Sequence, residues 1–464
     1  MLPTQLAELL GDDPAGAAEA LDLVTGLDRC LERGFARLGD EGAAALAAVA
    51  GALAATPLGD AAAVAAAKLT AGSVDHAHLL LLAGARSALL GALADALLAG
   101  FDSATGRARS PWEGPAPLAG GAGGPLVGCR SWLDELAITG WRGVDHDLVA
   151  SAEPTIQALL AEPAWRRLAV LVDGLAAELG ASCPVGALER LPLTRWADLW
   201  ARAMLLAEGP AATPVGTVSG RLLPLGVDLQ AHATAFQAQV HAVLEPAGGG
   251  QARLVRISVG AAKVDTIVGP SMWRLLDDHR VLLAALADRR AIDVDGLPIG
   301  AGGDLHWRDA QVTLGPPADP FATARVQLAA AVAPSTAPLE RHPVAIAEPV
   351  LVEGYTVTSG PSGGLTLEAG DQGLPVDTGR LSSCGPLTPA VVAASSACIG
   401  LLRWDDGWRL QPLAVLGTGR RRGVAVHAGD WAMGPTDPKV AKAVAKLGDP
   451  VAVLRERAGR LLRK

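Results

Sequence analysis

The residues of this sequence whose types and spacing best suit chemistry are arginines near its C-terminal end. Guanidinium groups bind phosphate and carboxylate oxygens, often through two parallel hydrogen bonds. We therefore interpret these arginines as a candidate polyanion-binding group, for which the alternative is a solvated face with ordinary salt bridges. The group consists of Arg403, Arg409, Arg420, Arg421 and Arg422.

The first two of these arginines lie on opposite arms of a predicted β-hairpin with the sequence LLRWDDGWRL. A two-residue turn at Asp406-Gly407 would place Trp404 opposite Arg409 and would mix polar and apolar faces. A three-residue loop with Gly407 in the left-handed position places Trp404 opposite Trp408 instead. We predict the second register, because it keeps the apolar side chains on one face and sends both arginines to the other.

Phosphate-binding signatures are absent from the sequence. A P-loop needs glycine-flanked backbone amides followed by Lys-Ser or Lys-Thr, and none of the six lysines has that setting. The glycines from Gly417 to Gly423 have the wrong spacing for a dinucleotide turn, and a strand-like segment follows where a helix should begin. These observations exclude ATP hydrolysis of the P-loop type, and we predict no cofactor.

The sequence also gives little support for metal ligands or catalytic nucleophiles. His76 and His78 are two residues apart in a predicted helix, so their side chains would diverge. Cys384 could be exposed, but the sequence offers it no obvious base. The polar run that begins at Asp145 is best explained as a helix start with an aspartate cap. We therefore predict no catalytic, cofactor-binding or metal-binding residues, although distant segments could still assemble an active site.

Composition sets further limits on what the chain can be. Its 464 residues suggest two to four domains, and a content of 50% hydrophobic and 19% charged residues excludes a disordered chain. The net charge of −9 argues against a protein whose whole surface binds nucleic acid. Five scattered cysteines without a paired motif resemble core residues of a reducing compartment, which favours a cytoplasmic location.

The apolar run Leu79–Phe101 is long enough to cross a membrane. Arg86 and Asp95 would then lie within the hydrocarbon, at a cost of about 2.5–3.5 kcal/mol each. No cationic segment followed by an apolar run indicates a secretory signal. We therefore expect a buried helix and no membrane span.

The elements that must position these residues change character near residue 210. Before it, Ala/Leu runs alternate with short Gly, Asp or Pro breaks, which predicts antiparallel helices. In one of them Trp196 and Trp200 share an apolar stripe between helices, and Asp198 and Arg202 pair on the wet side. After residue 210 the apolar period becomes two, as where Phe236, Ala238 and Val240 alternate with polar residues, which predicts half-buried strands.

The predicted fold class is α+β multidomain: an N-terminal all-α bundle or helical-hairpin array, then one or two small antiparallel β-barrel or sandwich modules and a C-terminal helix. A strand over Val350–Thr358 and a strand starting at Leu365 are expected to form a hairpin in the second module. The predicted divisions are a helical domain at 1–101, a Gly/Pro-rich linker or loop at 102–128, a helical continuation at 129–210, a β-rich module at 211–335 with an inserted helix near 270–290, a second β-rich module at 336–435 and a basic helix at 436–464.

Three functional hypotheses remain open. The multidomain layout and the missing motifs favour a non-catalytic interaction or scaffold protein whose partners are other proteins. The arginine group favours a nucleic-acid-associated factor that acts through the C-terminal β module, although sparse Tyr and Phe weaken the case for base stacking. The third hypothesis is an enzyme with a nonlocal active site.

Overall fold

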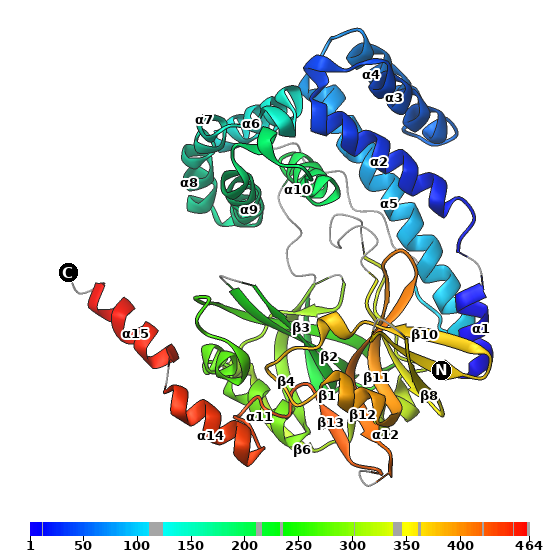
Figure 1. The fold of residues 1–464 in the computed structure, drawn as a ribbon, viewed down its shortest axis with the longest axis vertical. Coiled ribbons are helices and arrows are strands. Elements are labelled where there is room, and N and C mark those ends of the chain that lie inside the picture. The colour runs from blue at the N-terminus through cyan, green and yellow to red at the C-terminus, as the bar shows by residue number, and fades with distance from the viewer. Residues whose placement is uncertain are drawn as a thin grey trace.

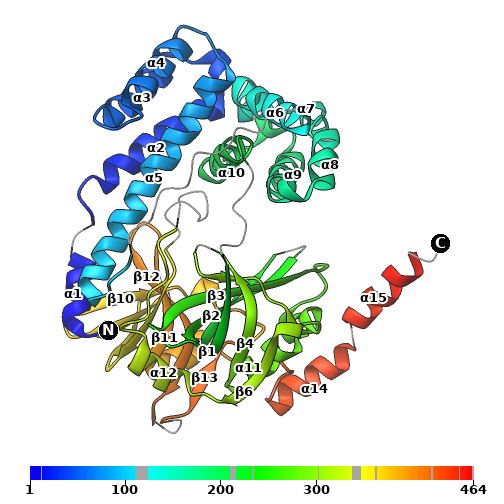
Figure 2. The same cartoon turned by 180° about the vertical axis from the view of Figure 1, so that it is seen from behind.

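The computed structural model describes residues 1–461 apart from 12, 111–123, 210–215, 233–234, 301, 337–345, 361–362, 420–421 and 449. Within the described residues, a helical region over residues 3–206 precedes two mixed, mostly antiparallel sheets and C-terminal helices. This confirms the predicted α+β multidomain class. The helical region arches over the two sheets, as both side views show (Figures 1 and 2). Half of the predicted linker at 102–128 lies outside the described residues.

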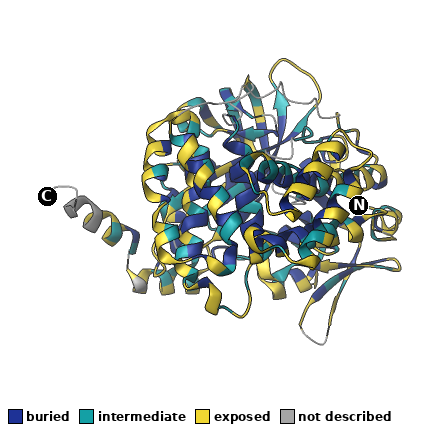
Figure 3. Cartoon of the chain, turned by 90° about the horizontal axis from the view of Figure 1, so that it is seen from above, coloured by how far each residue is buried: buried dark blue, intermediate teal, exposed yellow. Residues whose placement is uncertain are grey.

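The helical region consists of helices joined by short connections. Their bounds are α1 (Pro3–Gly11), α2 (Ala17–Arg33), α3 (Asp40–Leu53), α4 (Gly59–Thr70), α5 (His76–Thr105), α6 (Pro125–Thr139), α7 (His146–Ala150), α8 (Glu153–Ala161), α9 (Arg166–Ser182) and α10 (Leu193–Leu206). Seen from above, exposed residues gather toward the rim of the molecule and buried residues toward its centre (Figure 3). The predicted tryptophan seam is confirmed, because Trp196 and Trp200 are fully buried and the Trp196 ring meets that of Trp141 edge-on at 5.8 Å.

The predictions made from short sequence patterns in the helical region are partly confirmed. Asp145 caps α7 as predicted, because its carboxylate accepts a hydrogen bond from the backbone N–H of Leu148 at 2.8 Å. Asp198 and Arg202 pair as predicted at 3.4 Å. The expectation that this pair lies on the wet side is wrong, since the two side chains are only 16% and 9% exposed. The reason is tertiary: Asp198 also faces Arg86 of α5 at 3.5 Å.

Helix α5 joins the two halves of the molecule (Figure 1). Leu79 and Leu82 in its first turns belong to the core of the helical region, whereas Leu97 and Phe101 in its last turns belong to the core of the second sheet. It is also the helix of the described chain that is long and apolar enough to cross a membrane by length and composition, and half of its most apolar window is buried within the chain. α5 therefore sets the spacing between the helical region and the second sheet.

The first sheet closes on itself. Its strands are β1 (Gly216–Ala231), β2 (Ala235–Pro246), β3 (Arg253–Ala262), β4 (Arg290–Ile299), β5 (Asp304–Leu305) and β6 (Val312–Pro317). They follow the order β1-β2-β3-β5-β4-β6, and β1 also pairs with β4. Phe236, Ala238 and Val240 of β2 are buried, which confirms the predicted alternation. The helix expected near 270–290 is a 3₁₀ helix, η5 (Gly269–Leu276), followed by α11 (Arg280–Asp288).

The second sheet lies beside the first. Its strands are β7 (Glu348–Glu353), β8 (Thr356–Ser359), β9 (Leu365–Ala369), β10 (Gln372–Val376), β11 (Ser395–Trp404), β12 (Trp408–Gly417) and β13 (Ala425–His427). The predicted hairpin exists as β8 paired with β9. The single strand expected over Val350–Thr358 is wrong, because the chain turns at Gly354, whose φ of 73° suits glycine, and separates β7 from β8.

The first five strands of the two sheets share one topology. If β7 and β8 are counted together as a first strand, each sheet has three antiparallel strands, then a helix, then three further strands. The last strand differs between the sheets, because β6 pairs with β4 whereas β13 pairs with β12. In both sheets the third strand pairs in parallel with the fifth, β3 with β5 and β10 with β12. The fourth strand returns to the first in both, β4 to β1 and β11 to β7. The loops between the fourth and fifth strands, which contain Gly302 and Asp405, are therefore equivalent.

The remaining helices lie outside the sheets. α12 (Pro320–Gln327) follows β6, and α13 (Pro389–Ala393) separates β10 from β11. The C-terminal segment, predicted as one helix, forms α14 (Pro438–Leu447) and α15 (Pro450–Leu461). Val451 at the start of α15 is buried in the core of the first sheet, and from there the helix runs outward from the body of the molecule (Figure 2).

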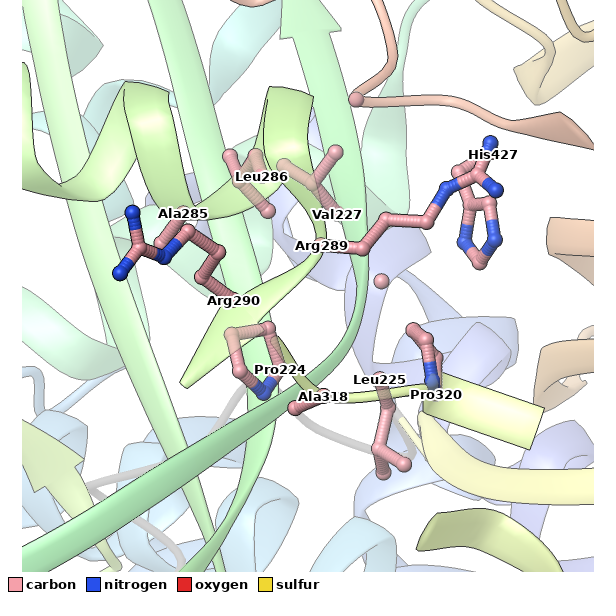
Figure 4. Close-up of a pocket in the computed structure, with 12 residues that line it drawn as sticks. Pro224, Leu225, Val227, Ala285, Leu286, Arg289, Arg290, Ala318, Pro320 and His427 are labelled. Atoms are coloured by element: carbon pink, nitrogen blue, oxygen red, sulfur yellow. The ribbon is translucent and has the colours of Figure 1, made fainter. Parts of the chain in front are cut away.

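The two sheets meet along a packed interface. Leu225 of β1 and Ile399 of β11 belong to one buried cluster there. Beside it is a cavity of about 20 Å³, enough for one water molecule, lined by His427 and Arg289 among others. Figure 4 shows the Arg289 side chain extending toward the imidazole of His427. The Nε2 atom of His427 has no hydrogen-bond partner among the described residues.

A glycine of β1 allows the two sheets to approach each other closely at this interface. A Cβ atom added at Gly226 would lie 2.6 Å from the Cβ of Leu413 in β12. We expect Gly226→Ala to lower the free energy of unfolding by about 1–3 kcal/mol, because the two sheets must move apart. Urea unfolding measures this. Gly248→Ala is the control, since its added Cβ would meet nothing within 4 Å and should change stability by less than about 0.5 kcal/mol. Equal effects of the two substitutions would contradict a tight interface.

Candidate ligand-binding cleft

The hairpin predicted from the sequence is present in the expected register. Trp404 pairs with Trp408 and Arg403 with Arg409, so the arginines share one sheet face and the tryptophans the other. The left-handed residue of the loop is Asp406, with φ of 52°, while Gly407 has φ of 127°. The tryptophan side is core: both rings are buried, and Trp408 lies 6.4 Å from the ring of Phe101 in α5.

A cavity of about 510 Å³ lies between this hairpin and the helical region, a volume typical of ligand sites. We call it the interregion cleft. Helices α2, α5 and α10 line one side of it, and β11, β12 and the 3₁₀ helix η8 (Thr378–Arg380) line the other. Its charged lining residues are Arg86, Arg195, Arg380, Arg403, Arg409, Asp198, Asp377 and Asp405.

The two hairpin arginines have different roles in the cleft. Arg403 is held in place, because its guanidinium donates to Asp228 of β1 at 2.9 Å and to Gln411 at 2.6 Å, and its side chain is 15% exposed. Burial lowers the pKa of Arg403, and the charge of Asp228 opposes that shift. Arg409 is exposed, and the structure gives it no ion-pair or hydrogen-bond partner among the described residues. Arg403 is thus a lining residue held in place by its partners, and the guanidinium of Arg409 is the positive charge that is available to a ligand.

The other arginines of the cleft already have carboxylate partners. Arg380 pairs with Asp377 at 3.0 Å, and the Nε of Arg195 donates to Glu178 at 2.8 Å. These two arginine side chains are 46% and 63% exposed. Exposed pairs contribute little to stability, so a ligand carboxylate or phosphate can compete for them. Arg86 is wholly buried and bound to Asp28, which leaves it a structural residue at the edge of the cleft.

The structure divides the predicted polyanion-binding group. It brings Arg403 and Arg409 together, whereas Arg422 follows the far end of β12, about 30 Å along an extended strand. Arg420 and Arg421 lie outside the described residues. Sequence reasoning missed Arg195 and Arg380 because each lies on a separate element far along the chain. It also missed Asp228, whose carboxylate fixes Arg403 across the interface between the sheets.

Other chemistry-bearing residues do not line this cleft. His76 lies between Asp134, 2.9 Å from its Nδ1, and Glu208, 3.2 Å from its Nε2, so it is part of a hydrogen-bond network that joins α5, α6 and the end of α10. Among the described residues, no group of three or more His, Cys, Asp or Glu is arranged to hold a metal ion. The suggestion that Cys384 is exposed is wrong: it is fully buried, and burial raises its pKa to about 11.

Comparison with known proteins identifies no relative. No family model matches the chain, and no curated protein or solved structure is significantly similar to it. The case for a function therefore depends on the geometry of the interregion cleft.

Proposed function

We propose that this chain is a non-catalytic interaction protein whose interregion cleft binds an acidic segment of a partner protein. The observation that carries the proposal is the convergence of five arginines from five separate elements, α5, α10, η8, β11 and β12, on one cavity. Three of them, Arg195, Arg380 and Arg409, have exposed side chains, and carboxylates are natural ligands of an exposed arginine because a guanidinium forms two parallel hydrogen bonds with a carboxylate. The described lining supplies charge pairs for recognition rather than a paired nucleophile and base.

The mixed charge of the cleft favours a peptide over a nucleic acid. Asp198, Asp377 and Asp405 lie between the arginines, and the whole chain carries a net charge of −9. A nucleic acid carries a negative charge at every nucleotide, so several phosphates would face these carboxylates at close range. A peptide can space its carboxylates to meet the arginines alone. Trp404 also lines the cleft, but it is only 9% exposed and Trp408 only 7%, so the hairpin offers no open aromatic face for base stacking.

The alternative is a nucleic-acid-associated factor that acts through the second sheet. It is supported by the paired arginines on one face of a small, barrel-like sheet, an arrangement that can follow a phosphate backbone. Binding that depends strongly on salt and prefers an oligonucleotide to a peptide of equal charge would favour this alternative.

The test reverses the charge of the unpaired arginine. We expect Arg409→Glu to weaken binding of a fluorescein-labelled, glutamate-rich octapeptide at least tenfold, because a charge-assisted hydrogen bond of about 1.5–3 kcal/mol is replaced by repulsion. Fluorescence anisotropy on the full chain measures the affinity. Arg422→Glu makes the same charge change at the far end of β12 and is expected to alter the affinity less than twofold.

Two outcomes would contradict the proposal. If Arg409→Glu and Arg422→Glu weaken the peptide equally, binding follows net charge and not the cleft. If an oligothymidylate of matched charge binds more tightly than the peptide, and only Arg409→Glu weakens it, the nucleic-acid alternative replaces the protein partner.

A further inference from the structure

A second cavity adjoins the interregion cleft. It has a volume of about 360 Å³ and shares the lining residue Ile346 with the cleft. Helix α5 borders both: Arg86 and Leu90 line the cleft, and Leu98 and Asp102, about two and three turns beyond Leu90, line the second cavity. The two cavities therefore follow one another along α5.

The shared topology of the two sheets explains why the cavities form a pair. Asp405, in the loop between the fourth and fifth strands of the second sheet, lines the interregion cleft. Gly302, in the equivalent loop of the first sheet, lines the second cavity. Each sheet thus presents the same loop to a different part of α5. A ligand that follows the helix would meet both loops in turn.

The length of this path identifies the kind of ligand. Arg86 and Asp102 are 16 residues apart on a helix that rises 1.5 Å per residue, which gives about 24 Å. An extended peptide covers that distance with about seven residues. A single carboxylate or a mononucleotide would fill only one of the two cavities.

The charge of the lining changes along the path. The cleft holds five arginines against three aspartates, whereas the second cavity holds Arg109 and Arg256 against Asp95, Asp102 and Glu348. Arg109 is bound to Asp102 at 2.9 Å and to Glu348 at 3.2 Å, and Arg256 to Asp304 at 2.8 Å, so these arginines are occupied. The same ion pairs also occupy Asp102 and Glu348, but the lining of the second cavity has one carboxylate more than it has arginines, whereas the lining of the cleft has two more arginines than aspartates. The second cavity consequently suits a neutral or basic stretch better than an acidic one.

From this arrangement we infer that the two cavities form one groove along α5 for an extended segment of about seven residues, with its acidic end in the interregion cleft and its neutral or basic end in the second cavity. The inference rests on the proposed function, because it takes the partner to be a protein. It adds to that function the conformation, length and charge order of the bound segment.

The experiment blocks the second cavity without touching the arginines. Ala99 is an exposed residue of α5 that lines the second cavity, whereas Ala96 is exposed on α5 and does not. The probes are an octapeptide with three glutamates at one end and two lysines at the other, the same peptide reversed, and a tetrapeptide that carries the glutamates alone. We expect one of the two octapeptides, the one whose chain direction the groove accepts, to bind the unmodified chain at least tenfold more tightly than the tetrapeptide. Ala99→Trp should remove that advantage and leave the tetrapeptide affinity within twofold.

Ala96→Trp is the matched control and is expected to leave all the affinities unchanged. Thr336→Trp, on the opposite wall of the second cavity, should repeat the effect of Ala99→Trp. The groove would be overturned if the octapeptides bound no more tightly than the tetrapeptide. It would also be overturned if the octapeptide kept its advantage in both blocking variants. In either case the effect of Arg409→Glu would still support the cleft. Loss of the Arg409→Glu effect would instead overturn the proposed function itself.

Discussion

Replacing Asp28 with alanine is expected to lower the free energy of unfolding by about 3–5 kcal/mol, because it leaves a buried guanidinium without its main partner. Arg86 is completely buried in α5 and Asp28 is 1% exposed in α2. The guanidinium donates to both carboxylate oxygens, at 2.8 and 3.1 Å, and to the backbone oxygen of Thr194 at 3.1 Å. After the substitution only Asp198, at 3.5 Å, remains as a counter-charge.

Urea unfolding followed by far-ultraviolet circular dichroism measures the loss. Glu41→Ala is the control, since it removes an ion pair with Arg33 in which both side chains are more than half exposed, and it should cost less than about 1 kcal/mol. A double variant, Asp28→Leu with Arg86→Met, tests the cause: it removes both charges and should recover most of the lost stability. If Asp28→Ala costs no more than Glu41→Ala, the buried pair does not hold α2 and α5 together.

Local sequence patterns predicted the elements that local forces decide. The hairpin register followed from the spacing of Trp404 and Trp408, because only one register keeps both rings on the same face. The stripe of Trp196 and Trp200 followed from helical periodicity. The break at Gly354 was missed because the residues on either side of it both favour strands, and only the pairing of β7 with β11 and of β8 with β9 separates them.

The cleft could not be assembled from sequence because its parts are nonlocal. Arg195, Arg380 and Arg409 come from elements whose neighbourhood depends on how α5 spans the helical region and the second sheet. Asp228 looks like an ordinary polar residue of a strand, yet it is 1% exposed because the second sheet covers it. One signal was available: Arg86 inside an apolar run indicated that a buried counter-charge would be needed, although the run did not reveal that Asp28 supplies it.

The second large effect is expected in acid, where two buried histidines should destabilise the fold. Burial is the main cause that lowers the pKa of His241 and His427 from 6.5 to about 3. Around His241, the charges of Arg256 and Arg403 lower the pKa further and Asp228 opposes them; around His427, the charge of Arg289 acts in the same direction as burial. His427 lines the cavity beside the interface between the sheets, and His241 of the first sheet lies close enough to Arg403 of the second to feel its charge. In each ring the Nε2 atom has no hydrogen-bond partner among the described residues.

The sign of the effect follows from proton uptake. Between pH 6.5 and 3 the unfolded chain binds a proton at each histidine and the folded chain does not, so stability falls with pH by about 1.4 kcal/mol per unit and per histidine. Above pH 6.5 neither state is protonated, and this contribution to stability is fully present. At pH 4.5 the two histidines together should therefore have removed about 5 kcal/mol.

Urea unfolding at pH 7.5 and 4.5 tests this expectation in a double variant, His241→Gln with His427→Gln. The readout is the difference between the two pH values, because the substitutions also change packing at both pH values alike. We expect that difference to shrink by several kcal/mol relative to the unmodified chain. His146→Gln, at an exposed position in α7, should leave it unchanged. An acid dependence that is the same in the double variant and the unmodified chain would assign acid unfolding to carboxylates elsewhere, and not to the interface between the sheets.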